Sequence, residues 1–523
     1  MNAVLLLLLL GQKFYPDDPI KEDRDDLPIE RPADIELSPT YDFLSNTFAP
    51  PEIEAPIPRA MNANTLGEVP DSTWFTNRIG VRDIHPEELA RGPHDGGPPD
   101  VSQPLTIISA KRDGITPGFT MRDSRGHVYF VKFDPKPYPS LSTGADMISK
   151  NFFHAIGYNV PEAYIVHVRA ENFVIHADAM VRLRGGKEAP MDRDYLELML
   201  DGAAGDPDGA VRALASLRVP GEILGPFRFY GSRSDDPNDI FPHQHRRELR
   251  GYRVFCAWLN HDDSRSINTL DTFSSQHVRH YLIDFGSTLG SGSDVSRNIA
   301  PQDPRAGNEY LIDLSQAWKT AYTFGLVDPR WRRIRYLYPE YAEAGRIEAE
   351  HFDPAAWKPE YPNPAFDRML PDDSFWAAKI VNRFSDDAIR AIVKAGEYRS
   401  AATEQYLADT LIKRRDKIVS YYFSLVNPLD GFTVTDSRLE FDHLGDHAPD
   451  EYRYQWFVFD NEKSKLERLG GEVGNRGPSV AVPDVEVPYL MVRIRADEGS
   501  KAVEVYLRRE ASGYEVVGID REI

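Results

Sequence analysis

The stretch HDDSRSIN (261–268) and the stretch HYLIDFG (280–286) decide what kind of fold this chain can form. In the first, four residues separate Asp263 from Asn268, on a loop that leaves a helix-like segment. In the second, Asp284 follows an apolar run that would bury a strand. Carboxylate and amide oxygens suit Mg²⁺, and strand and helix ends can aim them at one point. The two stretches therefore predict one phosphate-handling site with a divalent metal.

Two further features stand upstream in a fixed order. The strand-like YFVK ends in Lys132, after Gly114 and Gly118 of the loop DGITPG. Asp146 lies in the first turn of STGADMISKNFFHAI, whose apolar residues recur at helical spacing. Phosphoryl transfer needs a cation on the phosphates, metal-holding oxygens and a residue that orients the attacking hydroxyl. All three are therefore available, in the order that one site would require.

This order of glycine loop, strand lysine, helix acid, D-x-x-x-x-N and DFG resembles the protein-kinase-like superfamily, with its H-R-D-x-x-x-x-N loop and D-F-G loop. In style it is closer to divergent HipA-like and CotH-like kinases than to ordinary Ser/Thr kinases. The resemblance spans about residues 105–425 and rests on motif order. It implies that Asp263 orients the acceptor hydroxyl and takes its proton, and that Asn268 and Asp284 hold Mg²⁺.

The same resemblance implies a nucleotide site. Lys132 would bind the phosphates of ATP and pair with Asp146, and the backbone from Gly114 to Gly118 would cover the phosphates. Several features depart from the family pattern: the loop lacks G-x-G-x-x-G, and the helix acid is Asp rather than Glu. Phe130 also stands where kinases usually have a small residue facing adenine. These departures affect the residues predicted to bind the nucleotide more than the predicted metal ligands.

Simpler interpretations stay open for some of these residues. Lys132 could be an edge-strand lysine that reaches water. Thr143 and Asp146 fit a capping box, and Asp146 with Lys150 would make an i,i+4 pair. HDDSRSIN could be a plain helix exit, and His261 is expected to support that loop rather than bind metal. Asp262 replaces the usual arginine, and the spacing to Asn268 selects Asp263 as the base.

His243 and His245 in FPHQHRREL alternate as transition-metal ligands can. A helix N-terminal turn explains them better, because no third ligand is evident.

Cys256 is the single cysteine, so the chain has no internal disulfide and no thiolate metal cluster. Cys256 is expected to be a buried apolar residue.

The charge balance restricts the partners. The chain has 523 residues, of which 82 are acidic and 61 basic, giving a net charge of −21. Such a charge argues against nucleic acid and anionic membrane as partners. The run AVLLLLLL near the start is too short for a membrane span and has the length of a signal-peptide core, which favours an extracytoplasmic (periplasmic or secreted) location over a cytoplasmic one. No other segment is expected to span a membrane.

We therefore predict an α+β fold with a two-lobed kinase-like domain, an extended N-terminal arm and a C-terminal antiparallel β-sandwich. The predicted parts are a signal-peptide remnant (1–14), a Pro/Asp-rich arm (15–104), the kinase-like domain (105–425) and the sandwich (426–523). Within the kinase-like domain, the N-lobe would end near residue 230.

The predicted function is ATP- and Mg²⁺-dependent phosphoryl transfer to a hydroxyl acceptor, for which a protein is one candidate. The alternative is a catalytically inactive pseudokinase that acts as a binding or scaffold module. A metal-dependent hydrolase built on the Asp and His residues is a third hypothesis.

Overall fold

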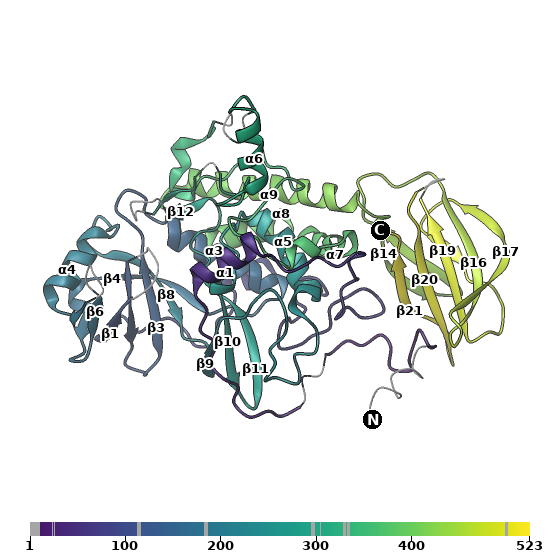
Figure 1. Ribbon diagram of the computed structural model, residues 1–523, viewed down its shortest axis with the longest axis horizontal. Coiled ribbons are helices and arrows are strands. Elements are labelled where there is room, and N and C mark those ends of the chain that lie inside the picture. Colours follow the sequence, from purple (N-terminus) through teal and green to yellow (C-terminus); the bar gives the residue numbers. More distant parts are fainter. Residues whose placement is uncertain are drawn as a thin grey trace.

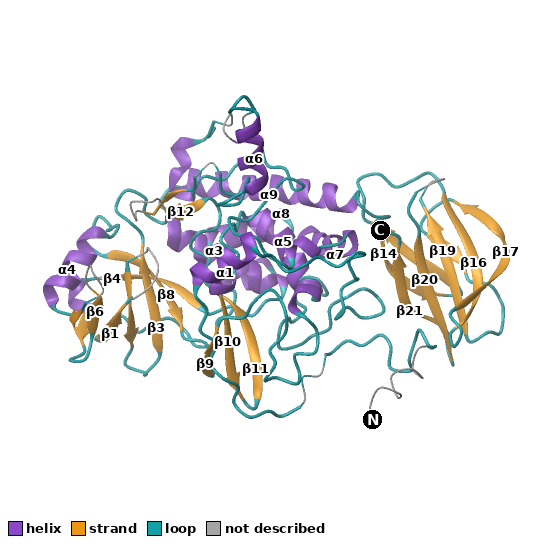
Figure 2. Ribbon diagram, in the orientation of Figure 1, coloured by secondary structure: helices purple, strands orange, loops and turns teal. Residues whose placement is uncertain are grey.

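The fold is mixed α/β with several sheets. The computed structural model describes the chain except residues 1–10, 24, 26, 112–116, 183–186, 294–298, 304, 328–330, 332–334 and 497–499. Figure 1 shows a sheet at the left, a body of helices in the middle and further sheets at the right, and Figure 2 shows the same parts by secondary structure. The site predicted from the sequence lies where the left-hand sheet meets the helices.

A six-stranded sheet carries the predicted lysine. Its strands, in spatial order, are β4 (Ala163–Val168), β8 (Val211–Leu217), β3 (Val128–Phe133), β2 (Gly118–Arg122), β1 (Leu105–Ala110) and β5 (Phe173–Ile175). In β3, alternation sends Tyr129, Val131 and Phe133 into the core of the sheet. Phe130 and Lys132 therefore lie on the opposite face.

Helix α3 (Leu141–Ile156) packs beside this sheet and is almost wholly buried. Asp134, just after β3, fixes its start: its Oδ1 accepts hydrogen bonds from the amides of Ser142 and Thr143, at 2.8 and 3.0 Å. Gly157 ends the helix with a φ of 146°, a value that favours glycine. The capping-box interpretation of Thr143 and Asp146 is therefore wrong, because Asp134 caps a helix that begins earlier.

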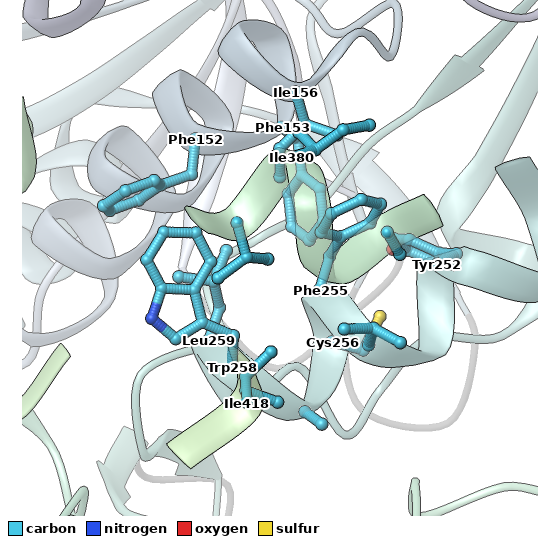
Figure 3. Packing of buried hydrophobic residues seen from close by; sticks show 14 of the residues in the cluster. Phe152, Phe153, Ile156, Tyr252, Phe255, Cys256, Trp258, Leu259, Ile380 and Ile418 are labelled. Carbon is cyan, nitrogen blue, oxygen red and sulfur yellow. The ribbon is translucent and has the colours of Figure 1, made fainter. Parts of the chain in front are cut away.

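The central body consists of helices around a large apolar core. They are α5 (Arg247–Leu259), α7 (Pro371–Asn382), α8 (Asp386–Lys394) and α9 (Ala401–Phe423). Figure 3 shows Phe152 and Phe153 of α3 close to Phe255 and Trp258 of α5 in this core. Cys256 is fully buried there, as expected for a small apolar residue. Helix α3 thus joins the sheet to the helical body.

A three-stranded sheet lies below the helices in Figure 1. It consists of β11 (His277–Leu282), β10 (Thr269–Ser274) and β9 (Glu222–Gly225). Strand β10 follows HDDSRSIN directly and pairs with β11 as an antiparallel hairpin. This pairing decides the geometry of the site.

The C-terminal residues form two antiparallel sheets with a shared apolar core. The smaller contains β14 (Leu429–Thr435), β15 (Arg438–His443) and β18 (Ser479–Ala481), and the larger β17 (Lys465–Asn475), β16 (Tyr452–Asp460), β19 (Tyr489–Arg495), β20 (Val503–Glu510) and β21 (Gly513–Arg521). Alternating inward residues from both sheets fill the space between them.

The N-terminal segment runs across several of these parts. Phe14 is buried against the larger C-terminal sheet, whereas Trp74 and Phe75 are buried in the helical core. The Trp74 ring stacks on His280 of β11 with ring centres 3.5 Å apart. Within the described residues, no helix combines the length and the apolar character that a membrane crossing needs.

The remaining elements are short. The helices are α1 (Pro39–Phe48), α2 (Pro86–Arg91), α4 (Arg193–Gly202) and α6 (Leu314–Tyr322), and the strands are β6 (Met180–Arg182), β7 (Glu188–Pro190), β12 (Ser291–Ser293) and β13 (Ile299–Pro301). Single 3₁₀ turns include η2 (His243–His245) and η3 (Ser266–Asn268). The histidine pair thus forms a turn before α5, as expected.

Candidate functional site

Lys132 joins two of the predicted acids. It stands near the end of β3, and its side chain is only 14% exposed. Its Nζ donates to Asp284 Oδ1 at 2.6 Å and lies 3.3 Å from Asp146 Oδ2. The interpretation of Lys132 as a lysine that reaches water from an edge strand is therefore wrong, because β3 is internal to the sheet and the ammonium is paired.

The three charges have unequal surroundings. Burial alone would lower the pKa of Lys132, but Asp284 and then Asp146 raise it above its usual range. Burial likewise favours protonation of Asp284, yet Lys132 holds the pKa of that carboxyl well below its usual range. For Asp146 burial prevails over Lys132, and its pKa is raised. Asp284 is thus the firmly ionised acid, and about half of its side chain (48%) is exposed to receive a ligand.

The register of the β10–β11 hairpin brings Asn268 beside the DFG stretch. Thr269 pairs with Leu282, so the next residues outward, Asn268 and Ile283, face each other. The Ile283 amide donates to the Asn268 carbonyl at 3.0 Å. Asp284 then leaves the strand with a φ of 61°, an uncommon value for a residue other than glycine. The backbone therefore joins the two sequence stretches that predicted the site.

The DFG stretch is anchored on α3. Phe285 is buried and stacks on Phe153, with ring centres 5.0 Å apart. A Cβ on Gly286 would lie 2.6 Å from the Ser142 hydroxyl, which explains the glycine at that position. Asp284 is thus held between the hairpin and the helix that carries Asp146.

Asp263 lies on the same loop as Asn268. Its backbone carbonyl accepts from Asn268 Nδ2 at 2.8 Å, and its Oδ1 pairs with Arg265 Nε at 2.6 Å. Burial raises the pKa of Asp263 to about 6, although Arg265 opposes the shift. The Arg265 guanidinium also stacks over Tyr361, 4.3 Å from the ring centre. Asp263 is therefore a carboxylate that can exchange a proton near neutral pH.

The two neighbours of Asp263 have other roles. The Asp262 carboxylate accepts from Gln302 Nε2 at 2.6 Å and so ties the loop to the segment after DFG. His261 is buried against aromatic rings of Phe153 and Phe285, and burial lowers its pKa to about 4. His261 is thus a neutral packing residue, as the sequence predicted, and Asp262 is bonded to Gln302.

The residues that the sequence predicts to face a nucleotide are described in part. Gly118 begins β2 directly opposite Lys132 on β3. Gly114 lies outside the described residues. Phe130 is 43% exposed on the same face of the sheet as Lys132, so it borders the space that a base would occupy.

The donor set fits the predicted metal. The Asp284 carboxylate and the Asn268 side-chain oxygen are hard oxygen donors, the kind that Mg²⁺ takes, and Lys132 supplies a cation beside them for phosphate. The metal-dependent hydrolase fits less well: both ring nitrogens of His243 are engaged, by the Arg228 carbonyl at 2.5 Å and by Asp239 at 2.7 Å. Among the described residues, no three His, Cys, Asp or Glu side chains gather as a metal-holding group.

A cavity of about 290 Å³ lies elsewhere, between α6 and the end of the helical body. It is lined by charged residues such as Asp313, Lys358 and Arg414, and none of the predicted site residues lines it. Asn260, on its wall, bonds to Gln302 and so connects it indirectly to Asp262. This cavity is therefore separate from the ion-paired cluster of Lys132, Asp146 and Asp284.

Sequence reasoning missed two cations. Arg265 lies two residues after Asp263, within the quoted loop, and its position there was the available signal. Lys111 precedes the glycine loop and contributes to lowering the pKa of Asp284. A basic residue beside each predicted acidic or phosphate-facing stretch could have identified both.

No protein-family description matches the chain, and no curated protein matches it. Among solved structures it is similar to a Helicobacter pylori proinflammatory kinase, CtkA, at 13% identity, covering 67% of this chain and 99% of that one, with a TM-score of 0.32. It is also similar to the Golgi casein kinase at 8% identity, covering 78% and 96%, with a TM-score of 0.32. The Golgi casein kinase with Mn/ADP bound gives 9% identity, the same coverage and a TM-score of 0.26.

Proposed function

We propose that this protein transfers a phosphoryl group from ATP to a hydroxyl acceptor, with Mg²⁺. The observation that carries the proposal is the Lys132 ammonium, which bridges Asp146 on α3 and Asp284 after β11. A structural ion pair needs only one of these acids. Two acids on separate elements hold the lysine at a fixed point, as binding a phosphate chain requires.

Each residue has a distinct task in this proposal. Lys132 binds phosphate oxygens, and Asp146 keeps its ammonium in place when a phosphate competes for it. Asp263 accepts a hydrogen bond from the acceptor hydroxyl, orients it and takes its proton. A carboxyl with a pKa of about 6 is ionised at neutral pH and can still take up a proton.

Asp284 and Asn268 would hold Mg²⁺, which when bound neutralises charge on the phosphates. Both positions are set by the backbone of the β10–β11 hairpin, since Ile283 and Asn268 share a hydrogen bond. Asp284 must exchange part of its contact with Lys132 for the metal. Its half-exposed side chain leaves room for that exchange.

A catalytically inactive nucleotide-binding module is the second candidate, and one observation favours it. The Asp263 carboxylate is already paired with Arg265 at 2.6 Å. If Arg265 stays in place when nucleotide binds, Asp263 cannot receive the acceptor hydroxyl at that oxygen. The two candidates share the nucleotide site and differ only at Asp263.

Nucleotide binding is tested by thermal shift and calorimetric titration of the full chain with ATP and Mg²⁺. We expect binding by the wild type, strong loss in Lys132→Met and loss of the Mg²⁺ dependence in Asp284→Ala. Lys136→Met is the matched control, because that lysine makes an exposed pair with Asp201. Absence of binding by the wild type, or equal binding by all variants, would refute the proposal.

Catalysis is tested separately with labelled ATP and a panel of hydroxyl-bearing acceptors that includes proteins. We expect Asp263→Asn to bind ATP as the wild type does and to lose transfer by at least about 100-fold, the scale of general-base catalysis. Binding without transfer in the wild type, unaltered by Asp263→Asn, would favour the binding module instead.

A further inference from the structure

Three residues form a row across the first three strands of the large sheet. Gly118 of β2 pairs with Lys132 of β3. On the other side, Ala110 of β1 pairs with Phe119, and the Lys111 amide donates to the Gly118 carbonyl at 3.0 Å. Directly opposed residues on antiparallel strands share one face of the sheet. Lys111 and Lys132 therefore lie on the same face, with Gly118 between them.

The other face of these strands is the apolar core. Ala110, Phe119 and Val131 are all buried in it. Since side chains alternate along a strand, Lys111 is directed to the face where Lys132 meets Asp284.

No side chain separates the two lysines. A Cβ on Gly118 would lie 2.1 Å from the Val131 carbonyl oxygen and 3.6 Å from Cδ of Lys111. The first distance excludes any larger residue without a backbone shift. The second shows that the aliphatic chain of Lys111 passes beside the bare glycine, toward the Lys132 side of the row.

The charges on this face are compatible with the placement. Lys132 pairs with Asp284 at 2.6 Å and with Asp146 at 3.3 Å, and Lys111 lies on the same face beside Gly118. Two lysines thus balance Asp146 and Asp284. When a divalent cation joins Asp284 the local charge becomes positive by about two, which suits a ligand with several negative charges better than one with a single phosphate.

We propose that Lys111 is a second phosphate-binding residue, so that Lys111 and Lys132 form a two-lysine cradle across Gly118 that selects nucleoside polyphosphates over monophosphates. This inference rests on the proposed function and extends it, because it names the ligand class that the site prefers. Because Gly118 has no side chain, the phosphate chain could lie between the two lysines and contact both ammonium groups.

The test is calorimetric titration of the full chain with ATP, ADP and AMP in the presence of Mg²⁺. In Lys111→Met we expect about a tenfold loss of ATP affinity, the scale of one charge-assisted contact, and less than about a twofold change for AMP. Lys111→Arg should retain most of the ATP affinity. Arg122→Met is the matched control, because Arg122 lies on the same face of β2 at its far end.

The outcomes separate the two proposals. ATP binding that is strongly reduced in Lys132→Met but unchanged in Lys111→Met overturns the cradle and leaves the proposed function standing. Equal losses for AMP and ATP, in a Lys111→Met variant with an unaltered melting temperature, also overturn the cradle. A wild type that binds none of the three nucleotides overturns both. Lys111→Gln gives a second neutral variant should the methionine variant fail to fold.

Discussion

Replacing Asp146 with asparagine separates a structural role from a functional one. Before any desolvation cost is subtracted, the Coulomb attraction between Asp146 and Lys132 at 3.3 Å is about 5 kcal/mol at an effective dielectric constant near 20. Burying the carboxylate costs several kcal/mol, and Asp284 repels it. The raised pKa of Asp146 shows that the costs exceed the attraction. We therefore expect the free energy of unfolding of Asp146→Asn to lie within about 1 kcal/mol of the wild-type value, and to be the higher of the two.

Activity should respond in the opposite way. Without Asp146, Lys132 pairs with Asp284 alone and competes with the metal for that carboxylate. We expect ATP affinity or transfer rate to fall about 10- to 100-fold, as misplacement of a binding group does. Urea denaturation and ATP titration of the same preparations give both numbers. Asp201→Asn is the control, because Asp201 pairs with Lys136 at the exposed surface and should change neither.

The pH dependence follows from the sign of the shift. A carboxyl whose pKa is raised by folding costs nothing below about pH 4, where both states are protonated, and costs most above its folded pKa. The stability advantage of Asp146→Asn should therefore vanish in acid and grow as the pH rises through the raised folded pKa of Asp146. Loss of more than about 2 kcal/mol with unchanged ATP affinity would refute this reasoning and make Asp146 a structural ion-pair partner.

Three further outcomes follow from buried groups. Lys132→Met leaves Asp146 and Asp284 facing each other, so we expect a loss of about 2 kcal/mol at pH 7 in urea denaturation that diminishes in acid, whereas an acid-insensitive loss would point to packing. Burial raises the pKa of the Cys256 thiol, so a thiol reagent should label it only after denaturation, and rapid native labelling would contradict its burial. Zinc should not raise the melting temperature, because both His243 ring nitrogens are bonded; a rise that His243→Ala removes would revive the hydrolase.

Much of the site could be predicted because its residues follow local rules. Alternation along YFVK grouped Lys132 with Phe130 on one strand face, and the structure agrees. The expectation that this face points inward was wrong, because Tyr129, Val131 and Phe133 fill the apolar core on the other face. Helical spacing placed Asp146 in α3, although it lies three residues beyond the third helical position, where a capping-box acid would stand. The order of these residues along the chain was sufficient to group them, because strand and helix ends meet at the sheet edge.

The contacts that join the parts could not be predicted. The strand β10, TLDTFS, alternates only weakly in polarity, so nothing local distinguished it from a loop. Residues 226–231, directly after β9, form no strand. The Thr269 hydroxyl accepts from the Phe227 amide at 2.9 Å and lies 2.6 Å from the Ser266 carbonyl and 3.0 Å from the Phe227 carbonyl, so a side chain takes the place of a backbone ladder here. A side chain can take the place of strand pairing in this way only where the tertiary fold brings the two segments together, so the sequence pattern gives no sign of it.

The same limit applies to Asp134 and Arg265. Asp134 caps a helix that begins seven residues later in the chain, at Leu141, a distance at which capping patterns give no signal. Arg265 was visible in the sequence, but its ion pair with Asp263 depends on how the loop folds. Each is a contact between polar groups whose spacing follows no helix or strand period.

The division of the site between backbone and side chains explains what remains variable in it. Asn268 and Asp284 are positioned by hairpin register, so their spacing survives changes in nearby side chains. Asp263 instead depends on Arg265, which shares its charge between that carboxylate and the Tyr361 ring. Under the proposed function, metal and nucleotide binding would therefore depend on the fold, whereas turnover would depend on whether the Arg265 guanidinium moves. Catalysis could then be lost through Arg265 alone, with nucleotide binding retained.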